Sequence, residues 1–148
     1  MPGLSENCDV IKGILPYYQK DQALHLSLVQ NSSLFKKGDS FSLEVVLPDF
    51  SVYLNIDYIQ ADGTVVHLVD NRYIDPQKTG HIIALGNNKE WVISEPFGVD
   101  MLVATVSKNA VFSFAREAFE NKVSYLRTWQ GITKQDVMVD FLHIQVSE

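Results

Sequence analysis

Asp57 and His67 are the two residues whose types and spacing most directly suggest chemistry. Each lies in a β-rich run, and the two runs meet at Ala-Asp-Gly, residues 61–63, a strong hairpin signal. A three-residue loop with Gly63 in the left-handed region places Asp57 opposite His67. Because an adjacent carboxylate favours the protonated imidazole, the pair predicts an acid–base or pH-sensitive contact. The alternative is a satisfied polar pair on a wet sheet face.

The alternation of polar and apolar residues favours this register over a two-residue turn. One face of the hairpin is then apolar and carries Leu54, Ile56, Tyr58, Val66 and Leu68. The other face carries Asn55, Asp57, Ile59, Val65 and His67. Since a slip of one residue moves every side chain to the opposite face, we expect the register that separates the two classes more cleanly.

Three aromatic residues are further candidates for binding: Tyr53, Trp91 and Phe97. Trp91 and Phe97 could form an exposed platform for a partner or a sugar. The alternative is that Trp91 belongs to the core and Phe97 packs against its own turn. Together with Asp57 and His67, these aromatic residues form the predicted binding set.

The sequence predicts no catalytic residue, no metal ligand and no cofactor. Residues 33–36, 70–71 and 78–80 follow the order of motifs in penicillin-binding enzymes and β-lactamases. The mechanics do not fit, because Ser33 lies in a polar loop instead of opening a helix. Cys8 lacks the local signatures of a catalytic cysteine, and the four histidines are too far apart in sequence to suggest a metal site.

Cys8 is the single cysteine, so it cannot close a disulfide within the chain. We expect a small buried residue on an N-terminal helix, because free cysteines are often buried. An intermolecular disulfide is the alternative, while Asn7 and the short upstream segment exclude a bacterial lipid anchor. The role of Cys8 stays open.

The elements that must position these residues are mostly strands. Alternating or β-rich runs predict strands at residues 24–30, 41–47, 52–60, 64–69, 81–85, 91–94, 100–107 and 140–146. Helices are predicted from residue 7 to about 19, ended or bent by Pro16, and over 114–130, ended by Gly131. The fold class is mainly β: an antiparallel β-sandwich of about seven to eight strands, one packed amphipathic helix and a short N-terminal helix. The long alternating strands favour sheets with one wet face.

Composition limits the partners. The 148 residues, 46% hydrophobic and 20% charged, predict a single globular domain over residues 1–148. A net charge of −6 opposes binding to nucleic acid or to an anionic membrane surface. The start of the chain lacks the pattern of a signal peptide, and no run reaches the ~18 apolar residues of a membrane span. The compartment stays open, with the cytoplasm favoured over an extracytoplasmic or secretion-associated location.

Several ordered motifs resemble the bacterial family called domain of unknown function 4384. They lie at residues 48–50, 53–57, 62–68, 91–93, 96–98, 101–104, 124–126 and 140–142, within a family-like region of about 8–146. A departure is Val69-Asp70-Asn71, where relatives tend to carry a proline. The resemblance implies a C-terminal accessory β module of multi-domain signalling or envelope proteins, without established catalytic residues.

From this we expect a non-enzymatic module that binds another protein or regulates an attached domain of a bacterial signalling or secretion-associated system. The alternative is a β-sandwich that binds a small ligand or glycan through Tyr53, Trp91 and Phe97. A third hypothesis is a hydrolase built around Cys8 or His67. The partner and the oligomeric state stay open.

Overall fold

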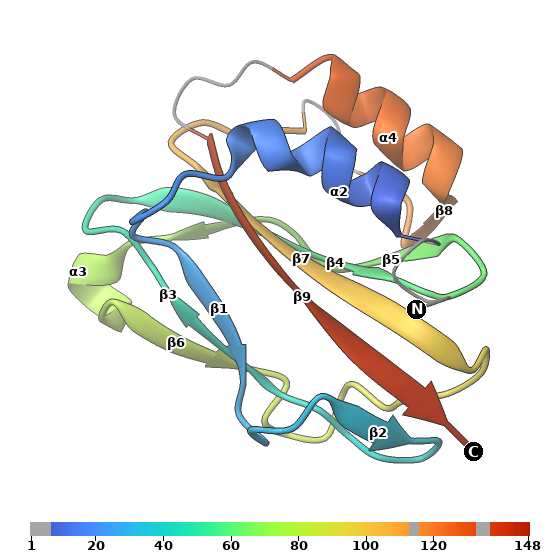
Figure 1. Cartoon of the computed structure of the whole chain (residues 1–148). Helices are drawn as coiled ribbons and strands as arrows, with labels where there is room; N and C mark the ends of the chain where they lie inside the picture. Colours follow the sequence, from blue (N-terminus) through green and yellow to red (C-terminus); the bar gives the residue numbers. More distant parts are fainter. Residues whose placement is uncertain (1–6, 113–115, 133–136) are drawn as a thin grey trace.

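The computed structural model describes residues 7–112, 116–132 and 137–148. Within these residues nine strands form two sheets (Figure 1). The smaller sheet has the order β1 (His25–Leu28), β3 (Leu43–Val46), β6 (Ile82–Leu85). The larger has the order β2 (Leu34–Lys36), β9 (Val137–Ser147), β7 (Gly98–Ser107), β4 (Val52–Ile59), β5 (Thr64–Ile74), β8 (Phe119–Asn121). The predicted mainly β, sandwich-like fold is confirmed.

The large sheet is the middle of three layers. The small sheet packs on one face, and helices α2 (Cys8–Ile14) and α4 (Lys122–Gln130) cover the other (Figure 1). A 3-10 turn, η1 (Leu15–Tyr17), continues α2, and the short α3 (Pro76–Thr79) links the two sheets. One apolar core fills the space between the sheets, and a second lies between the large sheet and the helices.

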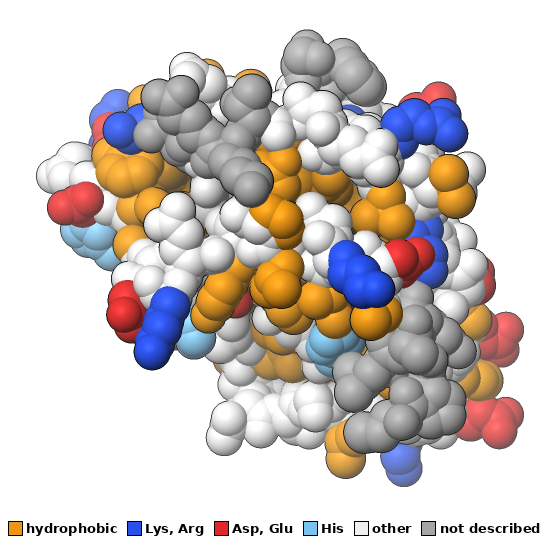
Figure 2. Space-filling model, turned by 45° about the horizontal axis from the view of Figure 1, so that its top comes forward, with side chains coloured by type: hydrophobic (Ala, Val, Ile, Leu, Met, Phe, Trp, Pro, Cys, Tyr) orange, Lys and Arg blue, Asp and Glu red, His pale blue; other side chains and the backbone are white. Residues whose placement is uncertain are grey.

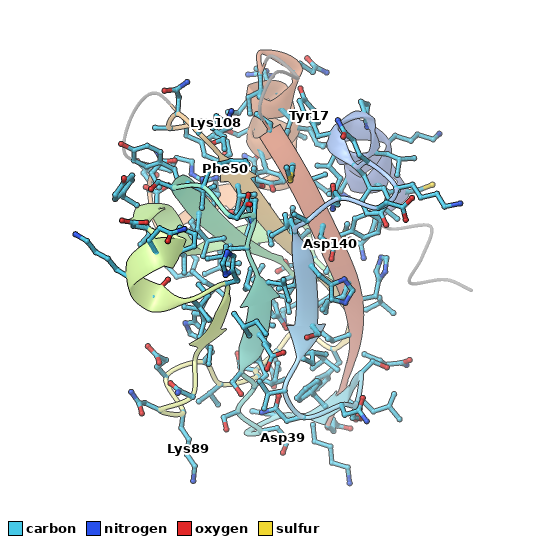
Figure 3. All side chains as sticks on the ribbon, turned by 90° about the vertical axis from the view of Figure 1, so that its left-hand side faces the viewer. Tyr17, Asp39, Phe50, Lys89, Lys108 and Asp140 are labelled. Atoms are coloured by element: carbon cyan, nitrogen blue, oxygen red, sulfur yellow. The ribbon has the colours of Figure 1, made fainter. Side chains whose placement is uncertain are left out.

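Asp140 ties the two sheets together where they meet. It lies on β9 close to β1 (Figure 3), and its Oδ2 accepts a hydrogen bond from the backbone N–H of Leu26 at 2.8 Å. At one end of the sandwich, the Lys108 ammonium lies 4.9 Å from the centre of the Phe50 ring. Of the two contacts, the hydrogen bond of Asp140 links a strand of the small sheet to the large one.

The expectation of sheets with one wet face is wrong for the central strands. β4 is buried at seven of its eight positions, and β7 is buried from Asp100 to Ser107. The reason is the helical layer, which covers the face that the polar residues suggested was wet. In these strands, alternate side chains therefore point into two different buried layers, and neither face is in water.

The predicted hairpin register is confirmed beside the turn, from Asp57 to Ile59, and is wrong further along, where register shifts between Leu54 and Asp57 pair Ile56 with Val69 instead of Leu68. Asp57 pairs with His67 and Ile59 with Val65, and Gly63 has a φ of 90° in the loop between the strands. The backbone N–H of Gly63 donates to the carbonyl of Gln60 at 2.9 Å, which closes the turn.

Two element predictions are wrong, and one strand was not predicted. The helix expected over 114–130 begins only at Lys122, because residues 119–121 form β8 against β5 and the Asn121 side chain caps the helix through the Ser124 N–H. Its first predicted residues, within 113–115, lie outside the described residues. The run 91–94 is no strand and makes a single bridge between Ser40 and Val92. β2 was missed, because it is three residues long and pairs in parallel with the distant β9.

The N-terminal helix is shorter than predicted, and Pro16 falls within the 3-10 turn. Cys8 is exposed, which corrects the expectation of a buried thiol, because the buried positions of α2 are Val10 and Ile14. Across the described ranges, no helix is both long and apolar enough to cross a membrane.

Candidate functional site

The first candidate site is a group of ionisable side chains between the large sheet and α4. We call it the charge cluster, and it consists of Asp57, His67, Arg116, Glu120 and Tyr125. The side chains of Asp57 and His67 are 0% and 1% exposed. At such burial, losing a hydrogen bond in the cluster destabilises the fold, because an unpaired buried charge costs free energy.

His67 lies between two carboxylates. Its Nδ1 is 2.6 Å from Asp57 Oδ1, and its Nε2 contacts Glu120 Oε2. A neutral imidazole has only one N–H, so both contacts are favourable hydrogen bonds only when His67 is protonated. Burial lowers the pKa of His67, but the hydrogen bond and charge of Asp57 and the hydrogen bond of Glu120 outweigh burial and raise it.

Asp57 is held from two further directions. Its Oδ2 accepts a hydrogen bond from the Tyr125 hydroxyl at 2.8 Å, and its Oδ1 accepts from Arg116 Nη2 at 3.0 Å. Burial raises the pKa of Tyr125 well above its usual value, and the charge of Asp57 raises it further. Arg116 also donates from Nε to Asp70 at 2.8 Å, so its position is fixed.

The predicted pairing of Asp57 with His67 is therefore correct, while the wet sheet face expected for it is wrong. The additional members were missed because they come from segments far away in the chain. Tyr125, Arg116 and Glu120 lie 68, 59 and 53 residues from their partners in the cluster. No local spacing signals contacts of that kind.

The second candidate site is a cavity of about 240 Å³ beside the small sheet, which we call the Tyr58 pocket. Four aromatic residues contribute to its lining: Phe41, Tyr58, Trp91 and Phe119. Gln60, Glu90 and Ser94 supply polar groups. A mostly apolar cavity with a few polar groups is the usual form of a small-molecule site.

Tyr58 is linked to a buried carboxyl group. Its hydroxyl donates a hydrogen bond to Asp100 Oδ2, and the backbone N–H of Ala61 donates to Asp100 Oδ1 at 2.8 Å. Burial raises the pKa of Asp100 to about 6, although both hydrogen bonds oppose that shift. The pKa of Tyr58 is also raised, chiefly by burial. The pair can therefore hold or release a proton near neutral pH.

Of the three aromatic residues predicted for binding, Trp91 alone is among the lining residues. Tyr53 lies towards the other end of β4, where its ring is 5.4 Å from that of Tyr73. Phe97 is 36% exposed in the segment before β7. The structure thus brings Trp91 together with Tyr58 and Phe119, and it separates Trp91 from Tyr53.

Two exposed apolar side chains contribute to the lining of the Tyr58 pocket and form its rim. Val92 and Phe119 are 56% and 61% exposed, and both contribute to the lining. Among the described residues, the lining includes the carboxylate of Glu90 and no lysine or arginine. The pocket as it stands suits an apolar group and a hydroxyl better than a carboxylate.

The helical layer carries a separate hollow of about 410 Å³. Its lining includes Pro16, Tyr17, Leu126 and Trp129, and hydrophobic side chains gather in patches on this face (Figure 2). Tyr17 fixes the end of η1, because its hydroxyl donates to the Ile132 carbonyl at 2.6 Å. This surface suits packing against a protein better than chemistry.

As to metals, the described part of the chain contains no group of three or more histidine, cysteine or acidic residues arranged to hold an ion.

No known family model matches the chain. The resemblance to the family of unknown function therefore stays an expectation. The chain is similar to the 3-isopropylmalate dehydratase small subunit of Clostridioides difficile (strain 630), with 28% identity over 106 residues. The match covers 66% of this chain and 60% of the length of that relative.

This likeness corrects the functional prediction. A relative named as the small subunit of a dehydratase contradicts the expectation of a non-catalytic accessory module and of a protein with no enzymatic role. The expectation of a protein partner agrees with it at a coarse level, because a small subunit belongs to a protein of more than one subunit.

Proposed function

We propose that this chain is a small subunit of a multi-chain enzyme and that the Tyr58 pocket forms one wall of its active site. The observation that carries the proposal is the hydrogen bond from Tyr58, in the lining of the pocket, to the buried Asp100. Because the Asp100 pKa is about 6, a fraction of Asp100 is protonated near neutral pH, and that form can supply a proton through Tyr58. The similarity to a dehydratase small subunit supports the same class of reaction.

In a dehydration, a C–O bond and a neighbouring C–H bond break, a C=C bond forms, and water leaves. Tyr58 donates its proton to the departing hydroxyl and receives one from protonated Asp100, so that the pair supplies the acid. A base must remove the proton from carbon, and a cation must hold a substrate carboxylate. We assign the cation to the partner chain, because the lining residues that the structure describes include no lysine or arginine, and we assign the base to that chain as well.

The rim gives the partner a place to bind. Val92 and Phe119 expose more than half of their surface at the mouth of the pocket. A second chain placed over them buries apolar area, which favours association, and closes the pocket to water. The low dielectric of a closed pocket strengthens the hydrogen bonds that act in the transition state.

The test is an activity assay on the native complex. The tagged chain is expressed in its source organism, isolated with whatever chain remains bound, and supplied with 3-isopropylmalate, whose loss is followed by mass spectrometry. Tyr58→Phe should lower turnover by about 10²-fold or more, as expected for loss of a general acid. Tyr53→Phe is the matched control, because Tyr53 is on the same strand and outside the pocket lining.

Two results would contradict the proposal. One is a chain that isolates alone and turns over nothing. The other is a complex in which Tyr58→Phe and Tyr53→Phe have equal activity, which would remove Tyr58 from the reaction.

A further inference from the structure

The charge cluster and the Tyr58 pocket share one short element, β8. Glu120 on β8 contacts His67, and its neighbour Phe119 contributes to the lining of the pocket. Successive residues of a strand point to opposite faces, so one strand presents Glu120 to the cluster and Phe119 to the pocket. Whatever holds Glu120 in place also holds this part of the pocket wall.

β8 depends strongly on side-chain contacts. It has only three residues, all of which pair with β5, and it lies at the edge of the large sheet. Beyond that ladder, the backbone N–H of His67 donates to the Ala118 carbonyl at 2.9 Å, just before β8. A three-residue edge strand opens easily, because its opening breaks few backbone hydrogen bonds.

Charged and titratable groups face His67 from every element packed against it. Asp57 comes from β4, Glu120 from β8, and Arg116 from the segment before β8. Tyr125 comes from α4, with its ring centre 6.1 Å from that of His67. The two carboxylates favour the imidazolium and Arg116 opposes it.

Loss of the His67 proton affects the two carboxylate contacts unequally. Asp57 is fully buried and also held by Arg116 and Tyr125, so the Nδ1–H bond to it is the one retained. The unprotonated Nε2 then presents a lone pair to the carboxylate of Glu120, which is repulsive. The Glu120 side chain is already 17% exposed, so it can regain water by moving outward.

We infer that His67 and Glu120 form a protonation-dependent lock, which holds β8 and the Phe119 wall of the Tyr58 pocket in place while His67 is protonated and releases them when it is not. The inference rests on the proposed function only in taking this pocket as the active-site wall. It adds a means by which pH controls access to the pocket.

The direction follows from linkage. The folded-state pKa of His67 is raised above its ordinary value of about 6.5. The stabilisation is therefore complete below that ordinary pKa and is lost as pH rises through the raised pKa. The wall is held while the pH is below the raised pKa of His67, and it loosens as the pH rises through that pKa.

The test is an NMR titration of the purified chain from about pH 6 to about pH 10, a range that begins below the ordinary pKa of histidine. It follows the His67 imidazole, the Phe119 ring and the protection factors of the β8 amides, which correct for the intrinsic pH dependence of exchange. Phe119 should change with the midpoint of His67, and the β8 protection factors should fall by about tenfold or more above it.

Two variants separate the lock from general alkaline loosening. Glu120→Gln removes the repulsion, so the change in Phe119 that follows His67 should disappear. His25→Gln is the matched control, because His25 also faces a carboxylate, at 3.7 Å from Asp140, and is 71% exposed; it should leave the change intact.

The inference is overturned if the His67 pKa in the wild-type chain is not raised above its ordinary value, if Phe119 does not follow its titration, or if Glu120→Gln keeps the same transition. None of these readouts depends on catalysis. A failed activity assay and a failed lock can therefore be told apart.

Discussion

At the scale of single residues, Asp57 joins β4, β5, α4 and the segment before β8. It accepts hydrogen bonds from His67, Arg116 and Tyr125, and water reaches none of its surface. A buried carboxylate is tolerated only when cations and hydrogen-bond donors surround it, and here two of the donors are cationic. Removing its charge therefore affects several partners at once.

Asp57→Asn should destabilise the fold by about 3–5 kcal/mol, the range for breaking a buried ion pair, because Arg116 and protonated His67 lose their counter-charge. The free energy of unfolding from urea titration measures the loss. The same variant should lower the His67 pKa, because Asp57 contributes the two largest raising effects on it.

Glu44→Gln provides the control, since Glu44 is exposed on β3 and its replacement should change stability by no more than about 0.5 kcal/mol. An Asp57→Asn protein as stable as this control, with an unchanged His67 titration, would contradict the pairing seen in the structure.

At the scale of elements, the loop after β6 determines how Trp91 sits in the pocket lining. Gly86 has a φ of 76°, and a Cβ atom placed on it would lie 2.4 Å from Trp91 Cε3. Glycine is required here for two reasons: the backbone is in the left-handed region, and the indole ring of Trp91 lies where a Cβ atom would be.

Gly86→Ala should destabilise the fold more than Gly38→Ala does. Both positions have a positive φ, which costs about 1–2 kcal/mol for a residue with a side chain. Gly38 has no atom within 4 Å of such a Cβ, so the additional loss at Gly86, about 1–3 kcal/mol, reports the clash with Trp91. Urea unfolding measures both variants, and Trp91 fluorescence in a Trp129→Phe background follows the ring. Equal losses and an unchanged spectrum would contradict this account.

The same scale shows what the sequence can predict. The hairpin register beside the turn followed from local alternation, because a period of two fixes which residues share a face, whereas the register shifts between Leu54 and Asp57 did not. The layer that covers each face could not be predicted from local alternation. Arg116 and Tyr125 come from segments about sixty residues away from Asp57, and local periodicity contains no information on such contacts. Polar residues that are buried and paired beneath a covering helix alternate along a strand in the same way as polar residues that face water.

The Tyr58 pocket was missed for a related reason. Tyr58 was correctly placed on the apolar face, but its partner Asp100 lies 42 residues away. Trp91 was identified as a candidate from its type alone, while Tyr53 and Phe97 were grouped with it without a spatial reason. The helix over 114–130 was predicted too long because its spacing continued across β8, where pairing with β5 prevails over helical periodicity.

At the scale of the whole molecule, two apolar cores share the large sheet. Leu54 faces the core between the sheets and Ile59 faces the core under the helices, although both lie on β4. Since the central strands form a wall of both cores, we expect loss of packing in one core to disturb the other. The three layers should therefore unfold as one cooperative unit.

The two tryptophans make this measurable, because each reports on a different layer. Trp91 packs against the core between the sheets. Trp129 belongs to α4 and is buried in the core between the large sheet and the helices. In single-tryptophan backgrounds made by Trp91→Phe or Trp129→Phe, Leu54→Ala should lower the urea midpoint seen by either probe by the same amount. The loss should correspond to about 2–5 kcal/mol, and Ile59→Ala should act in the same way from the other face. A Trp129 midpoint that is insensitive to Leu54→Ala would mean that the helical layer holds the sheet independently. The lock at β8 would then act on a layer uncoupled from the sandwich core, and its release would leave the rest of the Tyr58 pocket unchanged.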